Sequence, residues 1–310
     1  MNASGETPIV FTASDLADGG KDFRELDPPA RLAVFGDPVA HSASPPMHNA
    51  ALKARGLELQ YVRIRVTSEE LPQALRNLTA AGFLGASLTI PHKQAALTIM
   101  DEVSLESRLM GAVNTVQVVD GKLHGHNTDG PGLSAAIREE FGIPLKELRV
   151  LILGGAGGAG RAITVQCALE ECSGITIANR KTEKGDALAS EIMTARGVKV
   201  DSIALSALSS EALQSAVADS DLIINATPLG MKTDDPSPLP DGLLTAKHLV
   251  YDTVYSGGET ALLKQAKMVG SKGAGGLSML LHQGALQNSL WFGETAPVEM
   301  MRAALSESKR

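Results

Sequence analysis

The stretch Arg149-Val-Leu-Ile-Leu-Gly-Gly-Ala-Gly-Gly-Ala-Gly-Arg161 decides the fold class that we expect for this chain. Residues 150–153 are a short apolar run, which is typical of a strand buried on both faces. Residues 161–171 then follow with Ala, Ile, Val and Leu on one face of an expected helix. A strand, a glycine-rich turn and a helix in this order are the context of a dinucleotide-binding fingerprint. We therefore predict an α/β fold with a Rossmann-type nucleotide-binding domain.

Three glycines of this stretch, Gly155, Gly157 and Gly160, match the spacing Gly-x-Gly-x-x-Gly. We expect Gly155 to allow the tight turn, Gly157 to let a pyrophosphate lie against the backbone, and Gly160 to let helix and strand pack closely. The helix start offers unpaired N–H groups and a partial positive charge to phosphates. An ordinary structural turn is the alternative, because glycine-rich turns are common. The predicted cofactor contacts of the turn are Gly155, Ala156, Gly157, Gly158 and Ala159.

The end of the second strand in this domain indicates which cofactor is bound. An NAD site usually has Asp or Glu there, but this strand ends in Asn179-Arg180-Lys181, with Lys184 one turn later. The flat guanidinium of Arg180 suits the 2′-phosphate of NADP. A solvated basic cluster is the alternative. Because positive charge at a helix start opposes the helix dipole, we favour a bound anion and predict NADP as the cofactor.

Length and composition limit the remaining function classes. A chain of 310 residues suggests about two domains. A net charge of −7 gives no support for nucleic-acid binding, and no apolar run approaches the 18 residues of a membrane span. Cys167 and Cys172 lack metal or redox spacing, so we interpret them as free thiols in a reducing, cytoplasmic setting.

The order of the predicted elements divides the chain into segments. Residues 1–30 lack a periodic apolar pattern, and we expect a loose N-terminal tail. Residues 31–130 alternate strands and helices as a first domain, and residues 131–276 form the nucleotide-binding domain. We expect helices within 277–310 to close the first domain, and we doubt a regular strand at the glycine-rich residues 270–276.

A hairpin is predicted around Asp120-Gly121, which is a strong type I′ turn signal. His124 and His126 point to the same face of its second strand, as two metal ligands could. Because no third ligand accompanies them, we interpret this strand as an exposed edge and expect no metal site.

Several further motifs resemble those of the shikimate dehydrogenases, over nearly all of residues 31–305. They are Phe35-Gly-Asp-Pro-Val-Ala-His-Ser-Ala-Ser-Pro45, Leu88-Thr-Ile-Pro-His-Lys93, Gly111-Ala-Val-Asn-Thr115, Asn127-Thr-Asp-Gly130, Asn179-Arg180, Asn225-Ala-Thr-Pro-Leu-Gly-Met231, Tyr251-Asp252 and Gly276-Leu-Ser-Met-Leu-Leu-His-Gln283. The resemblance implies two α/β domains with a cleft between them, and the NADPH-dependent reduction of 3-dehydroshikimate to shikimate for aromatic amino-acid biosynthesis. It leaves a homodimer open.

The resemblance also implies roles for particular residues. Lys93 and Asp129 fall at the catalytic positions of the family, and Ser42 and Ser44 at those that hold the substrate carboxylate. The implied substrate ligands are Ser42, Ser44, Thr89, Lys93, Asn114, Asp129, Tyr255 and Gln283. Two further implied cofactor residues, Thr253 and Gly276, lie near the nicotinamide. Taken alone, each of Asn114, Asp129 and Gln283 is more often an ordinary loop cap, and Ser44 could be a helix cap as well as a substrate ligand.

The chain departs from the family pattern on the cofactor side. The family often has an apolar residue where Thr253 stands, and Val-Asn or Val-Asp before the final Gly-Leu, where this chain has Gly273-Ala274-Gly275. Two alternatives stay open. One is a quinate/shikimate dehydrogenase paralogue that favours NAD, and the other is a non-catalytic NADPH-binding sensor on the same fold, against which an intact Lys93 and Asp129 argue.

Overall fold

The computed structural model describes residues 9–17, 19–205, 210–255 and 258–307. The chain divides into two compact units: unit 1 consists of residues 1–128 and 281–310, and unit 2 of residues 129–280. Each unit is an α/β structure, so the predicted fold class is confirmed. Among the described helices, none combines the length and the apolar character needed to cross a membrane.

Unit 1 is built on a mixed sheet with the strand order β1-β3-β2-β4-β6-β7-β5. Its strands are β1 (Phe11–Thr12), β2 (Ala30–Gly36), β3 (Gln60–Arg65), β4 (Gly85–Leu88), β5 (Glu102–Val103), β6 (Thr115–Val119) and β7 (Lys122–His126). Its helices include η1 (Ala13–Leu16), α1 (Lys21–Glu25), α2 (Ser44–Ala54), α3 (Leu71–Ala80), η2 (Ala95–Thr98), α4 (Leu105–Met110) and α11 (Val298–Glu307). Strands β1 to β4 run parallel, whereas β6 is antiparallel to both β4 and β7.

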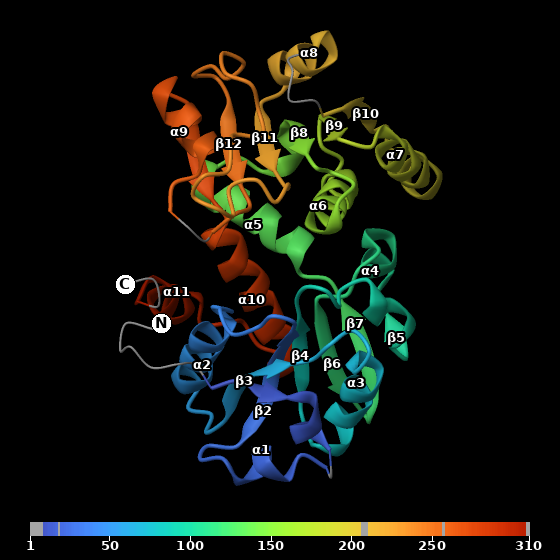
Figure 1. Ribbon diagram of the computed structural model, residues 1–310, viewed down its shortest axis with the longest axis vertical. Coiled ribbons are helices and arrows are strands. Elements are labelled where there is room, and N and C mark those ends of the chain that lie inside the picture. The colour runs from blue at the N-terminus through green and yellow to red at the C-terminus, as the bar shows by residue number, and fades with distance from the viewer. Residues whose placement is uncertain (1–8, 18, 206–209, 256–257, 308–310) are drawn as a thin grey trace. The chain divides into compact units, whose positions relative to one another are not determined.

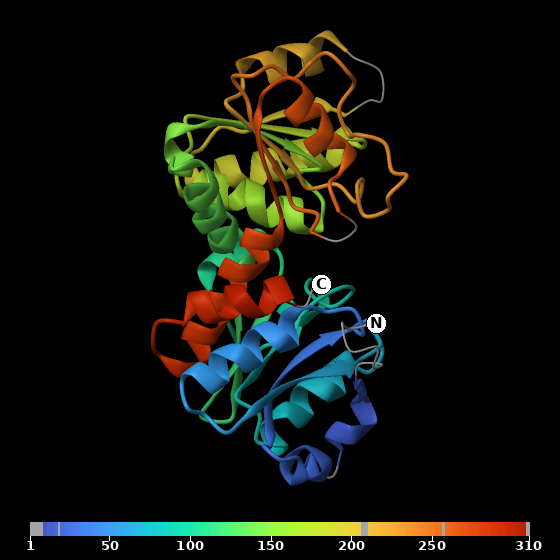
Figure 2. The ribbon, with the colours of Figure 1, turned by 90° about the vertical axis from the view of Figure 1, so that its left-hand side faces the viewer.

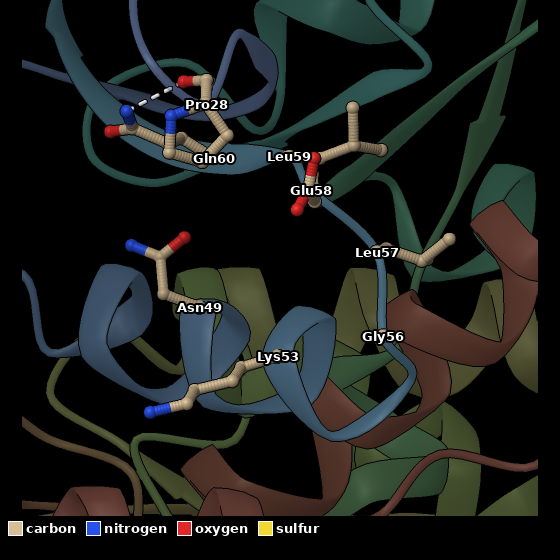
Figure 3. Close-up of a pocket in the computed structure, with 8 residues that line it drawn as sticks. All are labelled: Pro28, Asn49, Lys53, Gly56, Leu57, Glu58, Leu59 and Gln60. Atoms are coloured by element: carbon tan, nitrogen blue, oxygen red, sulfur yellow. Dashed lines mark hydrogen bonds between the residues drawn. The ribbon is translucent and has the colours of Figure 1, made fainter.

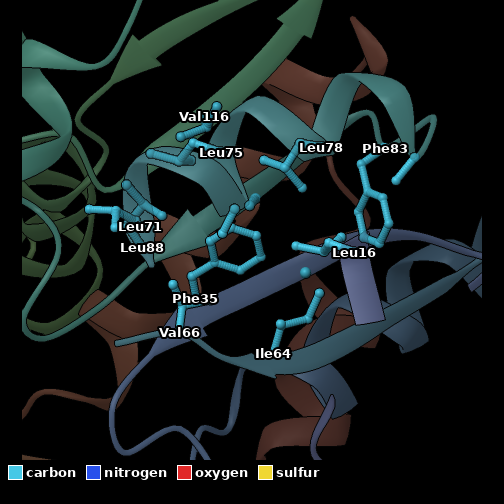
Figure 4. Packing of buried hydrophobic residues seen from close by; sticks show 14 of the residues in the cluster. Leu16, Phe35, Ile64, Val66, Leu71, Leu75, Leu78, Phe83, Leu88 and Val116 are labelled. Carbon is cyan, nitrogen blue, oxygen red and sulfur yellow. The ribbon is translucent and has the colours of Figure 1, made fainter. Parts of the chain in front are cut away.

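The two faces of this sheet are covered by different helices. Phe35 of β2 packs with Leu75 and Leu78 of α3 on one face (Figure 4). The neighbouring residues Leu32 and Val34 face the other way, into a cluster with α2 and α10 (Leu277–Phe292). Side chains that alternate along a strand in this way place a buried core on each side of the sheet.

The predicted hairpin is confirmed. Asp120 and Gly121 have φ angles of 50° and 78°, and β6 and β7 pair directly on either side of them. Positive φ at both central residues is what a type I′ turn requires. The edge interpretation of His124 was wrong, because β5 pairs with β7 at this residue and Glu102 of β5 lies 3.6 Å from it.

The N-terminal segment differs from the loose tail that we expected. Residues 1–8 and 18 lie outside the described residues, but β1 pairs with β3, and Leu16 and Phe23 are fully buried. The ring of Phe23 packs against those of Phe11 and Phe83, with 4.8 Å and 5.2 Å between the ring centroids. A few large apolar side chains anchor the segment, and such isolated anchors produce no periodic pattern in the sequence.

Unit 2 is a parallel sheet with the order β10-β9-β8-β11-β12-β13. Its strands are β8 (Arg149–Leu153), β9 (Gly174–Asn179), β10 (Asp201–Ala204), β11 (Leu222–Asn225), β12 (Leu249–Asp252) and β13 (Lys272–Gly275). Its helices are α5 (Asp129–Phe141), η3 (Leu145–Glu147), α6 (Gly158–Leu169), α7 (Thr182–Arg196), α8 (Glu211–Asp219), α9 (Ala261–Met268) and the first turn of α10. Helices lie on both sides of the sheet (Figures 1 and 2), and Leu151 and Leu153 of β8 pack with α8 and α9.

Our doubt about a strand near residues 270–276 was wrong. Residues 272–275 form β13, which pairs in parallel with β12. Gly273 faces Leu263 of α9 so closely that an added Cβ would lie 3.0 Å from its Cδ2. Glycine has a low strand propensity, but here its small size lets α9 pack close to this edge strand.

Candidate active site

The glycine turn follows β8 in unit 2 as predicted, but the structural requirement at each glycine differs from the one that we expected. The residue with left-handed backbone is Gly154, with a φ of 80°, and not Gly155. A Cβ on Gly155 would lie 2.5 Å from Cγ2 of Ile177, so Gly155 is needed for packing against β9. A Cβ on Gly160 would lie 2.1 Å from the carbonyl oxygen of Gly154, which confirms close packing of α6 on the turn.

The start of α6 has features that suit a phosphate group. No side chain caps the helix at Gly157, and a Cβ on Gly158 would meet nothing within 4 Å. Uncapped N–H groups at the start of a 12-residue helix attract anions, and the open space beside Gly158 would admit a ligand. The residues present therefore fit the pyrophosphate of a dinucleotide.

The end of β9 joins this turn to a group of exposed cations. Oδ1 of Asn179 accepts a hydrogen bond from the backbone N–H of Ala156 at 2.9 Å, while its buried Nδ2 has no partner in the structure. Arg180, Lys181 and Lys184 follow directly, and all three side chains are exposed. A hydrogen-bonded amide and exposed cations next to the glycine turn suit the ribose and 2′-phosphate of NADP.

Gly276 lies against the backbone of Thr253 in the same unit. A Cβ on Gly276 would lie 2.1 Å from the carbonyl oxygen of Thr253, and the N–H of Gly276 donates to Val254 at 3.1 Å. Any larger residue would displace the segment that follows β12. The contact of Thr253 and Gly276 with a nicotinamide stays a prediction.

In unit 1, Ser42 and Ser44 lie where the loop after β2 enters α2. Ser44 is the first residue of α2 and is buried, and its backbone N–H donates to Oγ of Ser42 at 3.3 Å. A cap role for Ser44 is wrong, because the N-cap of α2 is Ala43 and no side chain caps this helix. Nη2 of Arg63 donates to the Ser42 carbonyl at 2.8 Å, which places a cation beside this loop.

Thr89 and Lys93 flank a short turn after β4. The N–H of Thr89 donates to the carbonyl of Phe35 at 2.9 Å, and the carbonyl of Lys93 accepts from Val113 at 2.8 Å. Between them His92 is buried, where Nε2 lies 2.7 Å from the carbonyl oxygen of Val66, and burial lowers the pKa of its imidazole. Backbone and histidine contacts thus hold the segment that carries Lys93.

Asn114 and Gln283 come together, although 169 residues separate them. Nδ2 of Asn114 donates to Oε1 of Gln283 at 3.5 Å and to Oγ1 of Thr128 at 3.0 Å, and both amide side chains are buried. Oδ1 of Asn114 accepts from the N–H of Thr128 at 2.8 Å. Two oriented amides and a hydroxyl in one buried place suit a polyhydroxylated ligand.

The last two predicted substrate residues belong to unit 2. Asp129 is the first residue of α5 and is buried, and Tyr255 follows β12 with 39% of its surface exposed. Since Lys93 belongs to unit 1, its pairing with Asp129 stays a prediction.

A surface pocket of about 530 Å³ in unit 1 contains none of the predicted site residues (Figure 3). Two polar side chains of its lining are hydrogen-bonded to the backbone. Asn49 donates to and accepts from the backbone of Tyr61, and Gln60 donates to the Pro28 carbonyl at 2.6 Å. We therefore assign no ligand to this pocket.

Two polar residues beside the predicted ligands, Arg63 and Gln287, were not predicted from the sequence. Arg63 alternates with the apolar residues of β3, so it looks like an ordinary solvent-facing position. Gln287 follows Gln283 by four residues, which is one helical turn, and that spacing was a usable signal. Both make hydrogen bonds to predicted ligands or their backbone.

Together, the fold and the site define a two-unit α/β protein. One unit is suited to an NADP-type dinucleotide and the other brings hydroxyl and amide groups together for a small polar ligand. Residues 34–116 match the model of the shikimate dehydrogenase substrate binding domain, and residues 276–305 that of the shikimate 5'-dehydrogenase C-terminal domain. Residues 150–232 match a saccharopine dehydrogenase NADP binding domain.

Full-length relatives agree with these matches. The shikimate dehydrogenase (NADP(+)) of Methanopyrus kandleri is 40% identical over 284 residues, which cover 90% of this chain and 96% of the relative. The structure of shikimate 5-dehydrogenase from Thermus thermophilus with NADP(H) and shikimate is 38% identical, with a TM-score of 0.78 over 90% of this chain and 99% of that one. A quinate dehydrogenase from Corynebacterium glutamicum in complex with NAD is 31% identical, with a TM-score of 0.78 over 89% and 98%. This chain belongs to the shikimate dehydrogenase family.

Proposed function

We propose that this protein is an NADP-dependent oxidoreductase that reversibly reduces 3-dehydroshikimate to shikimate in aromatic amino-acid biosynthesis. The observation that carries the proposal is the buried pairing of Asn114 with Gln283, in a unit whose sequence matches the family's substrate-binding domain. Oriented amides of this kind recognise the hydroxyl groups that distinguish the ring of the substrate.

We assign the substrate carboxylate to the serine loop. The hydroxyls of Ser42 and Ser44 lie at the start of α2, where backbone N–H groups also favour an anion. Nearby Arg63 adds positive charge, since its Nη2 donates to the Ser42 carbonyl. Tyr255 serves the same carboxylate in this proposal. An anionic substrate is favoured at this loop over a neutral polyol.

We assign the ring hydroxyls to Thr89, Asn114, Asp129 and Gln283. Each presents an amide, carboxylate or hydroxyl group, and each lies at the end of an element or on a helix face rather than within an apolar core. A buried polar group of this kind binds a matching hydroxyl strongly, because a ligand that lacks the hydroxyl leaves the group unpaired.

We assign proton transfer to Lys93, with Asp129 orienting it. NADPH, when bound, supplies the hydride, and the protein must then manage the proton on the alcohol oxygen. Lys93 donates that proton during reduction and takes it back during oxidation, or stabilises the developing alkoxide with its charge. Asp129 accepts a hydrogen bond from a substrate hydroxyl and holds the ammonium group in place.

We assign the cofactor to the glycine turn and the end of β9. Residues 155–159 hold the pyrophosphate, Asn179 orients the adenosine ribose, and Arg180 with Lys181 and Lys184 binds the 2′-phosphate. Because no carboxylate ends β9, the ribose hydroxyls of NAD lack their usual partner. NADP is therefore the expected cofactor, and a preference for NAD is disfavoured.

We further propose a cytoplasmic homodimer. Cys167 and Cys172 are both free thiols, as a reducing compartment maintains them. Leu286 of α10 and Met300 of α11 are exposed apolar side chains that a second subunit could cover. Sedimentation equilibrium of the purified protein would distinguish a dimer from a monomer.

The proposal is tested by following NADPH absorbance as 3-dehydroshikimate is added. We expect NADPH to be consumed with saturable dependence on 3-dehydroshikimate, and NADP to be reduced when shikimate is supplied instead. A folded protein that binds NADPH but consumes none with either compound would be a sensor and not a dehydrogenase.

A further inference from the structure

A second buried glutamine lies one helical turn beyond Gln283 on α10. Gln287 is 1% exposed, and its Nε2 donates to Oε1 of Gln283 at 2.8 Å. The same Gln283 oxygen accepts the longer bond, of 3.5 Å, from Asn114. Both of these bonds engage the Gln283 amide oxygen, and the shorter one comes from Gln287.

The orientation of Gln287 is in turn fixed from its other side. Oγ of Ser87 donates to Oε1 of Gln287 at 2.7 Å, and the hydroxyl of Tyr61 donates to Oγ of Ser87 at 2.8 Å. Because Ser87 has one proton and accepts from Tyr61, that proton is directed at Gln287. The donors thus run in one direction, from Tyr61 through Ser87 and Gln287 to Gln283, and such chains strengthen each bond.

His48 supports the same orientation. Its Nε2 lies 3.3 Å from Oε1 of Gln287, and its ring stacks on Tyr61 with 4.4 Å between centroids. Burial lowers the pKa of His48 to about 3, so the neutral ring donates through Nε2. Burial also raises the pKa of Tyr61, while hydrogen bonds with Ser87 and Ser44 oppose that shift. The phenol of Tyr61 therefore stays protonated. Through Ser44 it connects this series of hydrogen bonds to the serine loop.

We propose that Gln287 is a positioning residue that fixes the carboxamide of Gln283, with its oxygen towards Gln287 and its nitrogen at the opposite end. The inference rests on the proposed role of Gln283 as a substrate ligand. With Gln287 in place, Gln283 meets a substrate hydroxyl as a donor through Nε2. Loss of Gln287 removes the shorter of these two bonds to the Gln283 oxygen, so the amide is held less firmly and part of the population presents the wrong end.

The next residue on α10 provides a matched control. Asn288 is also a buried amide, with 0% exposure, but its Oδ1 accepts from Nε of Arg55 at 3.0 Å. A purely structural role for buried amides on this helix predicts equal effects at both positions. A positioning role predicts an effect on shikimate at Gln287 alone.

The experiment compares Gln287→Met with Asn288→Leu, which are close to their parents in shape but lack the amide. We expect Gln287→Met to raise the KM for shikimate about three- to tenfold, the range of one net hydrogen bond, and to leave the KM for NADP unchanged. Asn288→Leu should change neither KM. Equal shikimate KM values in Gln287→Met and the parent would overturn the proposal, as would equal increases in both variants.

A double-mutant cycle separates this inference from the proposed function. If Gln287 acts through Gln283, then Gln287→Met adds no further increase in KM to a Gln283→Ala protein. Additive effects would overturn the inference. An unchanged KM in Gln283→Ala itself would remove Gln283 from the substrate site, and the proposed role would fail first.

Should Gln287→Met fail to fold, Ser87→Ala tests the same chain of hydrogen bonds. Loss of the serine donor frees the Gln287 amide to invert, so we expect the KM for shikimate to rise about two- to fivefold, with the KM for NADP unchanged. An unchanged shikimate KM in Ser87→Ala would overturn the inference.

Discussion

At the scale of single residues, Lys93 is held by its backbone on a segment that buried contacts stabilise. Its carbonyl accepts from Val113, and the preceding His92 is buried against the Val66 carbonyl. We predict that Lys93→Ala lowers turnover with shikimate at least about 100-fold while leaving NADP binding intact, because it removes the group that we propose takes up the hydroxyl proton during oxidation. The measurement is steady-state kinetics at neutral pH, with cofactor titration by fluorescence.

A surface lysine offers the matched control for Lys93. Lys122 is exposed and lies 3.9 Å from Glu102, and Lys122→Ala should keep full turnover. Retention of most activity in Lys93→Ala would show that another group transfers the proton.

In the proposed function, the cofactor preference depends most on Arg180. Its side chain is exposed directly after β9 and can form charge-assisted bonds with the 2′-phosphate. We predict that Arg180→Ala raises the KM for NADP about 10- to 150-fold and barely changes that for NAD. Lys199→Ala, at another exposed cation of unit 2, should change neither constant. A similar increase with both cofactors would place Arg180 away from the 2′-phosphate.

At the scale of elements, the close approach of α6 to the glycine turn has a direct consequence. A Cβ on Gly160 would meet backbone atoms of Gly154, which cannot rotate away. We predict that Gly160→Ala lowers the free energy of unfolding by about 1–3 kcal/mol, as overpacking does, and weakens NADP binding. Urea unfolding and cofactor titration check both effects.

Gly158 is the control within the same helix. An added Cβ would meet nothing within 4 Å, so Gly158→Ala should keep the parent's free energy of unfolding and should change only NADP binding. An equal free energy of unfolding in Gly160→Ala and the parent would contradict a tight contact between α6 and the turn.

The sequence predicted most elements whose signals are local. Asp120-Gly121 predicted its hairpin because positive φ is a property of those two residues, and the order of β8, the turn and α6 followed from periodicity. It failed at β13, where packing against α9 outweighs the low strand propensity of glycine. The sequence also misplaced the start of α2, because Ser44 is the first residue of the helix and Ala43 is its N-cap.

At the scale of the whole molecule, buried histidines make stability depend on pH. Burial lowers the pKa of His48 to about 3, so the folded protein keeps it neutral where the unfolded chain is protonated. The unfolded state binds more protons between about pH 6.5 and 3, and stability therefore falls as pH falls through that window. One such group contributes about 2 kcal/mol of loss between pH 7 and pH 5.

The fluorescence of Trp291 measures this loss, because it is the single tryptophan and its ring lies 5.2 Å from that of His48. We predict that the free energy of unfolding in urea falls less between pH 7 and pH 5 in His48→Gln than in the parent, by about 2 kcal/mol. The exposed His41→Gln should behave like the parent. An equal difference between the two pH values in His48→Gln and in the parent would contradict the burial of a neutral His48.

The site itself was predictable only in part. The resemblance supplied the candidates, but the pairing of Asn114 with Gln283 spans 169 residues and depends on where α10 returns to unit 1. No local pattern reports such a contact. Arg63 was missed for the same reason, because a polar residue on a strand becomes informative only once its partners are known. Gln287 differs, since its spacing of four residues from Gln283 was a usable signal.

The most direct test of the account is the specificity constant, kcat/KM, for shikimate and quinate, each with NADP and with NAD. We predict that shikimate with NADP has the highest value, because the proposed function assigns Arg180 to the 2′-phosphate and the site amides to the ring hydroxyls of shikimate. We expect at least a tenfold preference for NADP, the effect of one charge-assisted bond of about 1.5 kcal/mol. A highest value for quinate with NAD, or no reduction of either cofactor, would contradict it.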